Sequence, residues 1–148
     1  MSNYYTIGEV AERMHVTAHT LRYYDKEGLM PFVKRSDSGI RQFTEADFDW
    51  LHIIECLKAT GMPIKDIKTF IDWCMEGDST LAKRYEMFLE RRRIVLEQMQ
   101  ELQRTLDTID YKCWYYKTAA EAGTTDVHLR RPGYEPPVYP GAGSEQTE

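Results

Sequence analysis

One short stretch of the chain carries side chains that could bind DNA. It contains Thr17, His19, Arg22, Tyr23 and Tyr24. Arginine can donate hydrogen bonds to guanine or to a phosphate, and a tyrosine hydroxyl can bond the sugar-phosphate backbone. Tyr24 could equally be a core residue. We therefore expect this stretch to contact base edges and phosphates, provided that a helix presents it to the major groove.

Two short helices would position these side chains. Residues 7–14 place apolar side chains at helical spacing, and Thr6 with Glu9 fits a capping box at their start. After a tight turn, Thr17 can cap a second helix whose Leu21 faces back onto the first. The pattern predicts a helix-turn-helix with its second helix offered to a DNA major groove.

A basic hairpin is predicted directly after these helices. Segments 32–35 and 41–44 flank a polar turn that contains glycine, which is typical of two short antiparallel strands. The strands carry Lys34, Arg35 and Arg41, which could clamp phosphates or could simply form a solvated basic surface. A helix-turn-helix followed by such a hairpin indicates a winged-helix DNA-binding domain.

These motifs also carry a resemblance. They are Ile7-Gly-Glu-Val-Ala11, Thr17 with Leu21-Arg22-Tyr23-Tyr24-Asp25, Gly28-Leu29, and Arg35 with Ser38-Gly39-x-Arg41-x-Phe43. They resemble the MerR family of bacterial transcription regulators, densely over roughly the first 70 residues and in architecture to about residue 120. Ile40 departs from the pattern, which usually has an aromatic residue before the arginine.

The resemblance implies a mechanism. A homodimer joined by an antiparallel coiled coil would bind a palindromic promoter site inside an overlong spacer. Capture of an effector would then twist and bend the DNA, so that the RNA polymerase holoenzyme can engage both promoter elements. The resemblance also implies that effector pockets lie at the junction between the dimer helix and the DNA-binding domain.

Charge is distributed unevenly along the chain. The 148 residues carry a net charge of −5, yet residues 13–41 hold six lysines and arginines against three acids, a local excess of +3. A basic patch is what DNA binding requires, even in an acidic protein. Three cysteines, without a secretory leader or a long apolar run, favour a cytoplasmic protein with reduced thiols and no membrane contact.

The rest of the chain predicts more helix and a tail. Residues 44–61 and 63–76 each carry an apolar stripe at helical spacing, and the second stripe ends in Cys74. We expect a winged-helix domain with connecting helices over residues 1–77, a dimerisation helix over 78–122, and a mobile or loosely packed tail over 123–148. Tyr134 and Tyr139 could lay part of that tail over the dimer.

A heptad pattern over residues 81–116 predicts the dimer. Its two sets of positions are Tyr85, Arg92, Met99, Leu106 and Cys113, and Phe88, Val95, Leu102, Ile109 and Tyr116. Only Arg92 is off pattern, and one such helix cannot bury this seam against a small domain. The alternative is that the seam packs only on the two preceding helices. A two-fold dimer predicts a palindromic DNA site.

One cysteine could sense an effector. Cys56 points away from the apolar stripe of its helix, and His52 lies one turn before it. A protonated histidine there would stabilise a thiolate, and some relatives in the resembled family that respond to electrophiles carry a cysteine before a similar Thr-Gly-Met segment. The alternative is a quiet, packed Cys56. Cys74 and Cys113 fit core positions, and too few ligands gather for a metal or an iron–sulfur cluster.

Aromatic residues could instead form a pocket for an apolar or cationic effector. They are Phe70, Trp73, Tyr85, Phe88, Trp114 and Tyr116. Ordinary packing at the junction is the competing interpretation.

Enzymes and DNA-bending accessory proteins fit the sequence less well. The chain has no histidine spacing for a metal, no glycine-rich phosphate loop and no nucleophile motif. An accessory protein would not need the long heptad helix. The sequence therefore predicts a mainly α, dimeric, winged-helix transcription regulator that has no catalytic activity and needs no cofactor.

Overall fold

The computed structural model describes residues 3–141, most of them helical. The chain divides between Val95 and Leu96 into two compact units, and the division falls inside the longest helix. The three-part division into residues 1–77, 78–122 and 123–148 stays a prediction. Each of the two units is described separately below.

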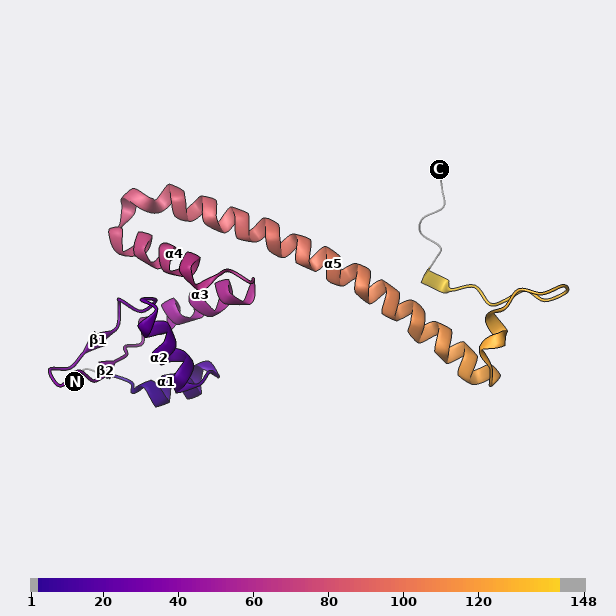
Figure 1. The fold of residues 1–148 in the computed structure, drawn as a ribbon, viewed down its shortest axis with the longest axis horizontal. Helices are drawn as coiled ribbons and strands as arrows, with labels where there is room; N and C mark the ends of the chain where they lie inside the picture. Colours follow the sequence, from indigo (N-terminus) through magenta and orange to yellow (C-terminus); the bar gives the residue numbers. More distant parts are fainter. Residues whose placement is uncertain (1–2, 142–148) are drawn as a thin grey trace. The chain divides into compact units, whose positions relative to one another are not determined.

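The first unit begins with the predicted helix-turn-helix (Figure 1). Helix α1 spans Ile7–Met14, and helix α2 spans Ala18–Lys26. The capping box at Thr6 is confirmed, because its hydroxyl accepts from the Glu9 amide at 3.2 Å while Glu9 accepts from the Thr6 amide at 3.3 Å. Thr17 caps α2 by accepting from the Thr20 amide at 3.0 Å. Local sequence signals thus place both helix starts.

The turn between the helices ends α1 abruptly. His15 caps α1 in the left-handed region, at φ 56°. The amide of the next residue, Val16, donates to the Ala11 carbonyl at 3.0 Å. This closes the turn in the manner of a left-handed helix cap and redirects the chain into α2.

The wing is a shorter hairpin than the sequence predicted. Strand β1 spans Lys34–Arg35 and strand β2 spans Arg41–Gln42, paired antiparallel with Arg35 opposite Arg41. Phe32 leaves the ladder and stacks on Trp50 with ring centroids 5.5 Å apart, which shortens the first strand. Phe43 is fully buried and forms a bridge to Tyr5, which ties the N-terminal segment to the wing.

Two further helices complete the core. Helix α3 spans Asp47–Ala59 and helix α4 spans Ile64–Glu76, followed by the 3-10 turn η1 over Asp78–Thr80. Asp47 is buried and its carboxylate accepts from the Thr44 amide at 2.8 Å, so it satisfies a backbone donor just before α3. Pro63 precedes α4 as its cap residue.

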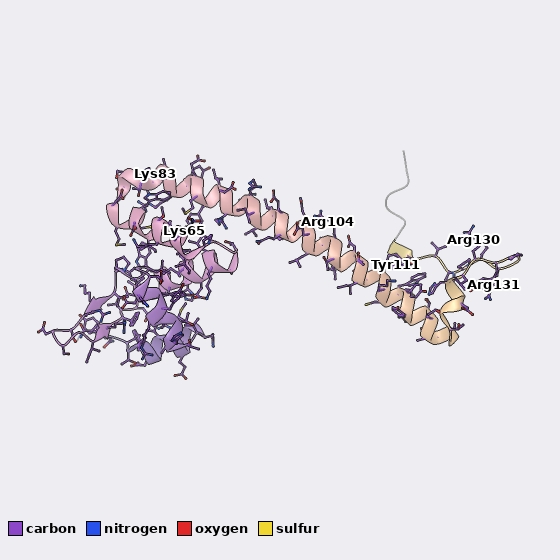
Figure 2. All side chains as sticks on the ribbon, viewed as in Figure 1. Lys65, Lys83, Arg104, Tyr111, Arg130 and Arg131 are labelled. Carbon is purple, nitrogen blue, oxygen red and sulfur yellow. The ribbon has the colours of Figure 1, made fainter. Side chains whose placement is uncertain are left out.

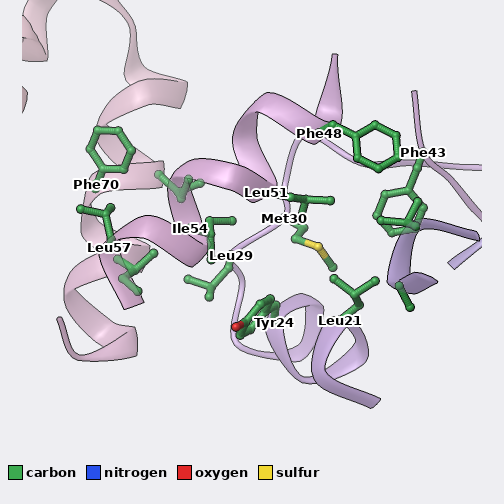
Figure 3. Close-up of a cluster of buried hydrophobic side chains, with 14 of the residues drawn as sticks. Leu21, Tyr24, Leu29, Met30, Phe43, Phe48, Leu51, Ile54, Leu57 and Phe70 are labelled. Carbon is green, nitrogen blue, oxygen red and sulfur yellow. The ribbon is translucent and has the colours of Figure 1, made fainter. Parts of the chain in front are cut away.

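The core lies between the helix-turn-helix and α3 (Figure 3). It is built from side chains with at most 3% of their surface exposed, namely Val10, Leu21, Tyr24, Leu29, Met30, Phe43, Phe48, Leu51, Ile54, Leu57, Ile67 and Ile71. Each fully buried side chain of this size contributes roughly 1.5–3 kcal/mol of hydrophobic stabilisation. Burial of the α2 face that carries Leu21 and Tyr24 fixes which face of α2 is left outside.

Helix α5 spans Leu81–Ala122 and contributes to both units. Its first turns belong to the first unit, where Phe88 meets Phe70 edge-on with ring centroids 5.3 Å apart and Met87 packs against the core. Arg84 donates to the Gly77 carbonyl at 2.8 Å, which satisfies a carbonyl at the end of α4. These contacts attach the start of α5 to α4.

The second unit contains the rest of α5, which carries Arg104 and Tyr111 (Figure 2). Its apolar seam is exposed, since Met99, Leu102, Leu106, Ile109 and Tyr116 are between 48% and 68% exposed in the single chain. Both the dimer and the alternative packing on the two preceding helices stay predictions.

The chain after α5 folds back on the helix end. A 3-10 turn, η2, spans Thr125–His128, and the His128 ring stacks on Tyr115 with centroids 3.9 Å apart. Tyr139 packs on Tyr111 and Trp114, each at 5.4 Å between centroids. Part of the predicted mobile or loosely packed tail thus packs on the end of α5 through His128 and Tyr139, while residues 142–148 of that tail lie outside the described residues.

Among residues 3–141, no helix has the length and apolar character that crossing a bilayer requires.

Candidate nucleic-acid interface

Helix α2 presents a polar face to solvent. His19, Arg22 and Tyr23 are exposed, and the Tyr23 ring keeps 44% of its surface accessible. Thr17 is also exposed, although its hydroxyl already serves as the helix cap. The helix therefore exposes an arginine, a histidine and a tyrosine on the side away from the core, in the way that a recognition helix must.

Tyr24 has to be removed from the predicted DNA contacts. Its side chain is 1% exposed, its hydroxyl donates to the Glu55 carboxylate at 2.7 Å, and Lys58 donates to that hydroxyl at 2.9 Å. Burial first, and then the bond to Glu55, raise the pKa of the Tyr24 hydroxyl above its ordinary value. Because α2 must bury one face to pack, the alternative core interpretation of Tyr24 is correct.

The wing arginines are held by an acid that the sequence analysis did not single out. One oxygen of Asp25 accepts from Arg35 at 2.6 Å and from Arg41 at 2.8 Å. Lys34 is exposed on the neighbouring position of the same strand. Arg35 and Arg41 thus lie beside the end of α2. The sequence did carry a signal for this contact, since Asp25 is an acid inside the basic segment of residues 13–41.

A second cluster links α1 to the start of α3. The Glu45 carboxylate accepts from both terminal nitrogens of Arg13 and, at 2.8 Å, from the Tyr5 hydroxyl. The Arg13 guanidinium lies 4.0 Å from the Phe48 ring centroid. Hydrogen bonds from Arg13, followed by that from Tyr5, hold the pKa of Glu45 below its ordinary value. This cluster stabilises the scaffold under the helix-turn-helix.

The three cysteines occupy different environments. Cys56 is exposed on α3, as predicted, and His52 is exposed one turn before it. Phe48 is buried in the core and leaves the thiol exposed. Cys74 is half-buried against the core with Arg84 at 4.0 Å, and burial raises the pKa of its thiol. Cys113 is exposed at its heptad position.

The predicted pocket residues divide between the two units. In the first unit Phe70 is buried against Phe88, Trp73 has the Lys83 ammonium 5.9 Å from its centroid, and Tyr85 is 63% exposed. In the second unit Trp114 packs against His128 and Tyr139, and Tyr116 is exposed. Among residues 3–141, no group of three or more histidine, cysteine or acidic side chains could hold a metal ion.

Comparisons with known proteins agree with this geometry. The family model described as MerR HTH family regulatory protein matches residues 5–72, and the model described as MerR, DNA binding matches residues 48–111. An uncharacterized HTH-type transcriptional regulator of Haemophilus influenzae is 43% identical over 120 residues, which cover 81% of this chain and 89% of that protein.

Solved structures agree as well. HiNmlR, a MerR family regulator lacking the sensor domain and crystallised on promoter DNA, is similar with a TM-score of 0.78 and 42% identity, over 84% of this chain and 98% of that one. A MerR family regulator from Bacillus thuringiensis is similar with a TM-score of 0.70 and 47% identity, over 75% and 97% of the two chains. The protein is thus a regulator and not an enzyme. It belongs to the MerR family of DNA-binding transcriptional regulators.

Proposed function

We propose that the chain acts as a homodimer that binds a palindromic promoter site and activates transcription by distorting the DNA in response to an effector. The observation that carries this proposal is the bare seam of α5. Leu102 and Ile109 are 68% and 52% exposed, and they lie one heptad apart on a helix of 42 residues. Burial of such a seam against a second copy supplies the free energy for pairing.

The DNA contacts would come from two elements. Arg22, His19 and Tyr23 would meet base edges and phosphates from α2, with Thr17 at the helix start, and the wing would grip phosphates. Lys34 and Arg41 are the best placed wing cations, because Lys34 is exposed and Arg41 keeps donors that Asp25 does not use. Two heads in one dimer favour a two-fold symmetric site.

The proposed dimer is tested by the size of the protein in solution and by its binding to DNA. The purified protein should sediment as a dimer, and in gel shifts it should prefer an inverted repeat over a single half-site by at least about 100-fold, because the second contact becomes intramolecular. The inverted repeat is obtained by selecting from random duplexes with the wild-type protein. A protein that stays monomeric, or that binds the half-site equally well, would contradict the proposal.

Arg41 provides a test of the wing. Arg41→Ala should weaken binding to every sequence and lower the slope of log affinity against log salt by about 0.9, the value for one phosphate contact on duplex DNA. Lys26→Ala is the matched control, since Lys26 is an exposed cation in the last turn of α2. An unchanged slope in the Arg41 variant would remove it from the interface.

The effector class divides into two candidates. The first is a reactive electrophile captured by Cys56, with His52 beside it; exposure of this thiol supports it, as does the raised pKa of Cys74, which makes that competitor less reactive. The second is an apolar or cationic molecule bound by the aromatic residues without covalent chemistry. The exposed Tyr85 and Tyr116 rings support the second candidate.

One experiment separates the two candidates. In vitro transcription from its own promoter should respond to a small aldehyde in the wild type and not in Cys56→Ser, while operator binding is retained. Cys113→Ser is the matched control, because its thiol is also exposed in the single chain. Mass spectrometry after brief treatment should find the adduct on Cys56. An unaltered response in Cys56→Ser, or adducts mainly on Cys74 or Cys113, would reject the thiol sensor.

A further inference from the structure

A single carboxylate joins the recognition helix to the wing. Asp25 stands in the last turn of α2, and its Oδ2 accepts from Arg35 Nη2 at 2.6 Å and from Arg41 Nε at 2.8 Å. The Asp25 and Arg41 side chains are 21% and 23% exposed, whereas that of Arg35 is 50% exposed. Two wing strands are therefore anchored to one atom of the helix that precedes them.

An acid at this position is unfavourable for two reasons. A carboxylate near a helix C-terminus opposes the helix dipole, and a carboxylate on a DNA-facing surface repels phosphates. The two arginines offset this repulsion locally, so that the three groups together carry a charge of +1. The charge of Asp25 weakens the attraction between this surface and DNA phosphates. If Asp25 favours DNA binding, it must therefore do so by positioning the groups that contact DNA.

The donors of the two arginines are used differently. Arg41 donates to Asp25 through Nε, which leaves both of its terminal amino groups without a hydrogen-bond partner among residues 3–141 and available for a bidentate bond to phosphate. Arg35 donates to Asp25 through Nη2 and to the Gly39 carbonyl through Nη1 at 3.0 Å. Both terminal nitrogens of Arg35 are thus engaged inside the protein, one of them with the wing turn.

We propose that Asp25 is a positioning residue for DNA binding, which holds the wing against α2, presents Arg41 to a phosphate, and uses Arg35 as an internal brace of the wing turn. Fixing Arg41 before the encounter reduces the side-chain entropy lost when it meets the phosphate. Fixing the wing relative to α2 favours duplexes on which both elements fit together. Asp25 therefore increases discrimination between sites while it lowers general affinity for DNA.

The test compares two acids that carry the same charge. Asp25→Asn removes the anchor, and Asp37→Asn is the matched control, because Asp37 is exposed in the wing turn and makes no ion pair within residues 3–141. Binding is measured on the inverted repeat selected by the wild type and on a scrambled duplex of equal length. The selection itself establishes the wild-type preference, so a failure of operator binding would be seen before any variant is compared.

Both variants should bind the scrambled duplex more tightly, because each loses one negative charge near the DNA. Only Asp25→Asn should lower the preference for the inverted repeat over the scrambled duplex, by roughly 3- to 10-fold, which corresponds to two partly exposed ion pairs. Asp25→Glu keeps the charge and should recover part of the preference. If Asp25→Asn increased the affinity for both duplexes equally, Asp25 would act by charge repulsion alone, and the proposal would be overturned.

Variants of the two arginines are compared by the slope of log affinity against log salt, which a purely structural role would leave unchanged. Arg41→Ala should lower the salt slope by about 0.9, whereas Arg35→Ala should leave the slope nearly unchanged and reduce only the preference. In the Asp25→Asn background, Arg35→Ala should cost little further preference, because the brace is already lost. Thermal unfolding of each variant is recorded alongside. Equal salt slopes for Arg35→Ala and Arg41→Ala would contradict the division of roles.

Discussion

Apolar side chains are buried in the first unit of the molecule and exposed along the helix of the second. In the first unit Leu21, Ile54 and Ile71 are at most 1% exposed, whereas in the second unit Leu102 and Ile109 are more than half exposed. The first unit packs these side chains into a core of its own. The seam of α5 lacks a counterpart within its own unit, so its stability depends on a second surface. The first unit thus carries the core of the DNA-binding fold, while the second carries the seam that we propose for pairing.

The largest expected effect comes from breaking the seam. Leu102→Asp combined with Ile109→Asp should make the protein monomeric, because two charges in each copy cannot be buried in a coiled coil. Affinity for the inverted repeat should then fall by at least about 100-fold, since the second head no longer binds intramolecularly. Analytical ultracentrifugation and gel shifts measure the two effects.

The matched control places charges on the same helix away from the seam. Gln100→Asp combined with Thr108→Asp should leave both size and affinity nearly unchanged, because these residues are exposed outside the heptad core positions. If the seam variant remains dimeric, the helix pairs through another face and the contrast between the units fails.

A core truncation tests the other side of the comparison. Ile54→Ala should lower the free energy of unfolding by about 2–5 kcal/mol, because its side chain is fully buried in the core and its truncation leaves a cavity. Leu102→Ala, at an exposed position, should instead act through assembly and depend on protein concentration. Urea unfolding at two protein concentrations separates the cases. An Ile54→Ala loss below about 1 kcal/mol would show that the core repacks easily.

Removal of the Tyr24 hydroxyl tests the hydrogen bonds that link α2 to α3. Tyr24→Phe should cost about 1–2 kcal/mol of unfolding free energy, because it leaves Glu55 and Lys58 without the hydroxyl that they share. Tyr23→Phe is the control and should change stability by less than about 0.5 kcal/mol, because its ring is at the surface. If the Tyr23 variant is the more destabilised of the two, α2 packs through a different face than the structure has it.

The smallest effect concerns the exposed Glu45 cluster and depends on pH. Because the folded state lowers the Glu45 pKa below its ordinary value of 4.5, this carboxylate contributes stability above that pH, and the contribution disappears as the pH falls through the lowered pKa. Glu45→Gln should therefore be slightly less stable at neutral pH and lose less stability on acidification. Thermal unfolding as a function of pH measures the difference, and parallel curves for the two proteins would contradict it.

Sequence patterns predicted the parts of the fold that depend on neighbouring residues. Thr6, Thr17 and the heptads of α5 are local signals, and each produced the element expected from it. Contacts across the fold were not predictable in the same way. Tyr24 meets Glu55 across 31 positions, and Arg41 meets Asp25 across 16, so neither pairing leaves a periodic trace.

The packing of the segment after α5 was predicted only in part, since Tyr139 was named as a possible contact and His128 was not. The segment's proline and glycine content is typical of mobile chain, and that composition hides the few rings that hold it in place. His128 bonds the Tyr115 carbonyl at 2.8 Å and the Thr118 hydroxyl at 2.9 Å, and one histidine among polar residues gives no pattern to read. Direct DNA and effector contacts stay predictions because they depend on molecules other than this chain.

The segment after α5 affects which sides of that helix are available for self-association. If Cys113 and Tyr116 occupy the seam, then Tyr111, Trp114, Tyr115 and Thr118 lie on the outer side of the helix, and this is the side that His128 and Tyr139 cover. Bare rings there would give each helix a second adhesive stripe, through which pairs of chains could join into open-ended filaments. If the proposed dimer forms through the seam, the contacts of His128 and Tyr139 with these rings would reduce association through the outer side and favour a closed pair.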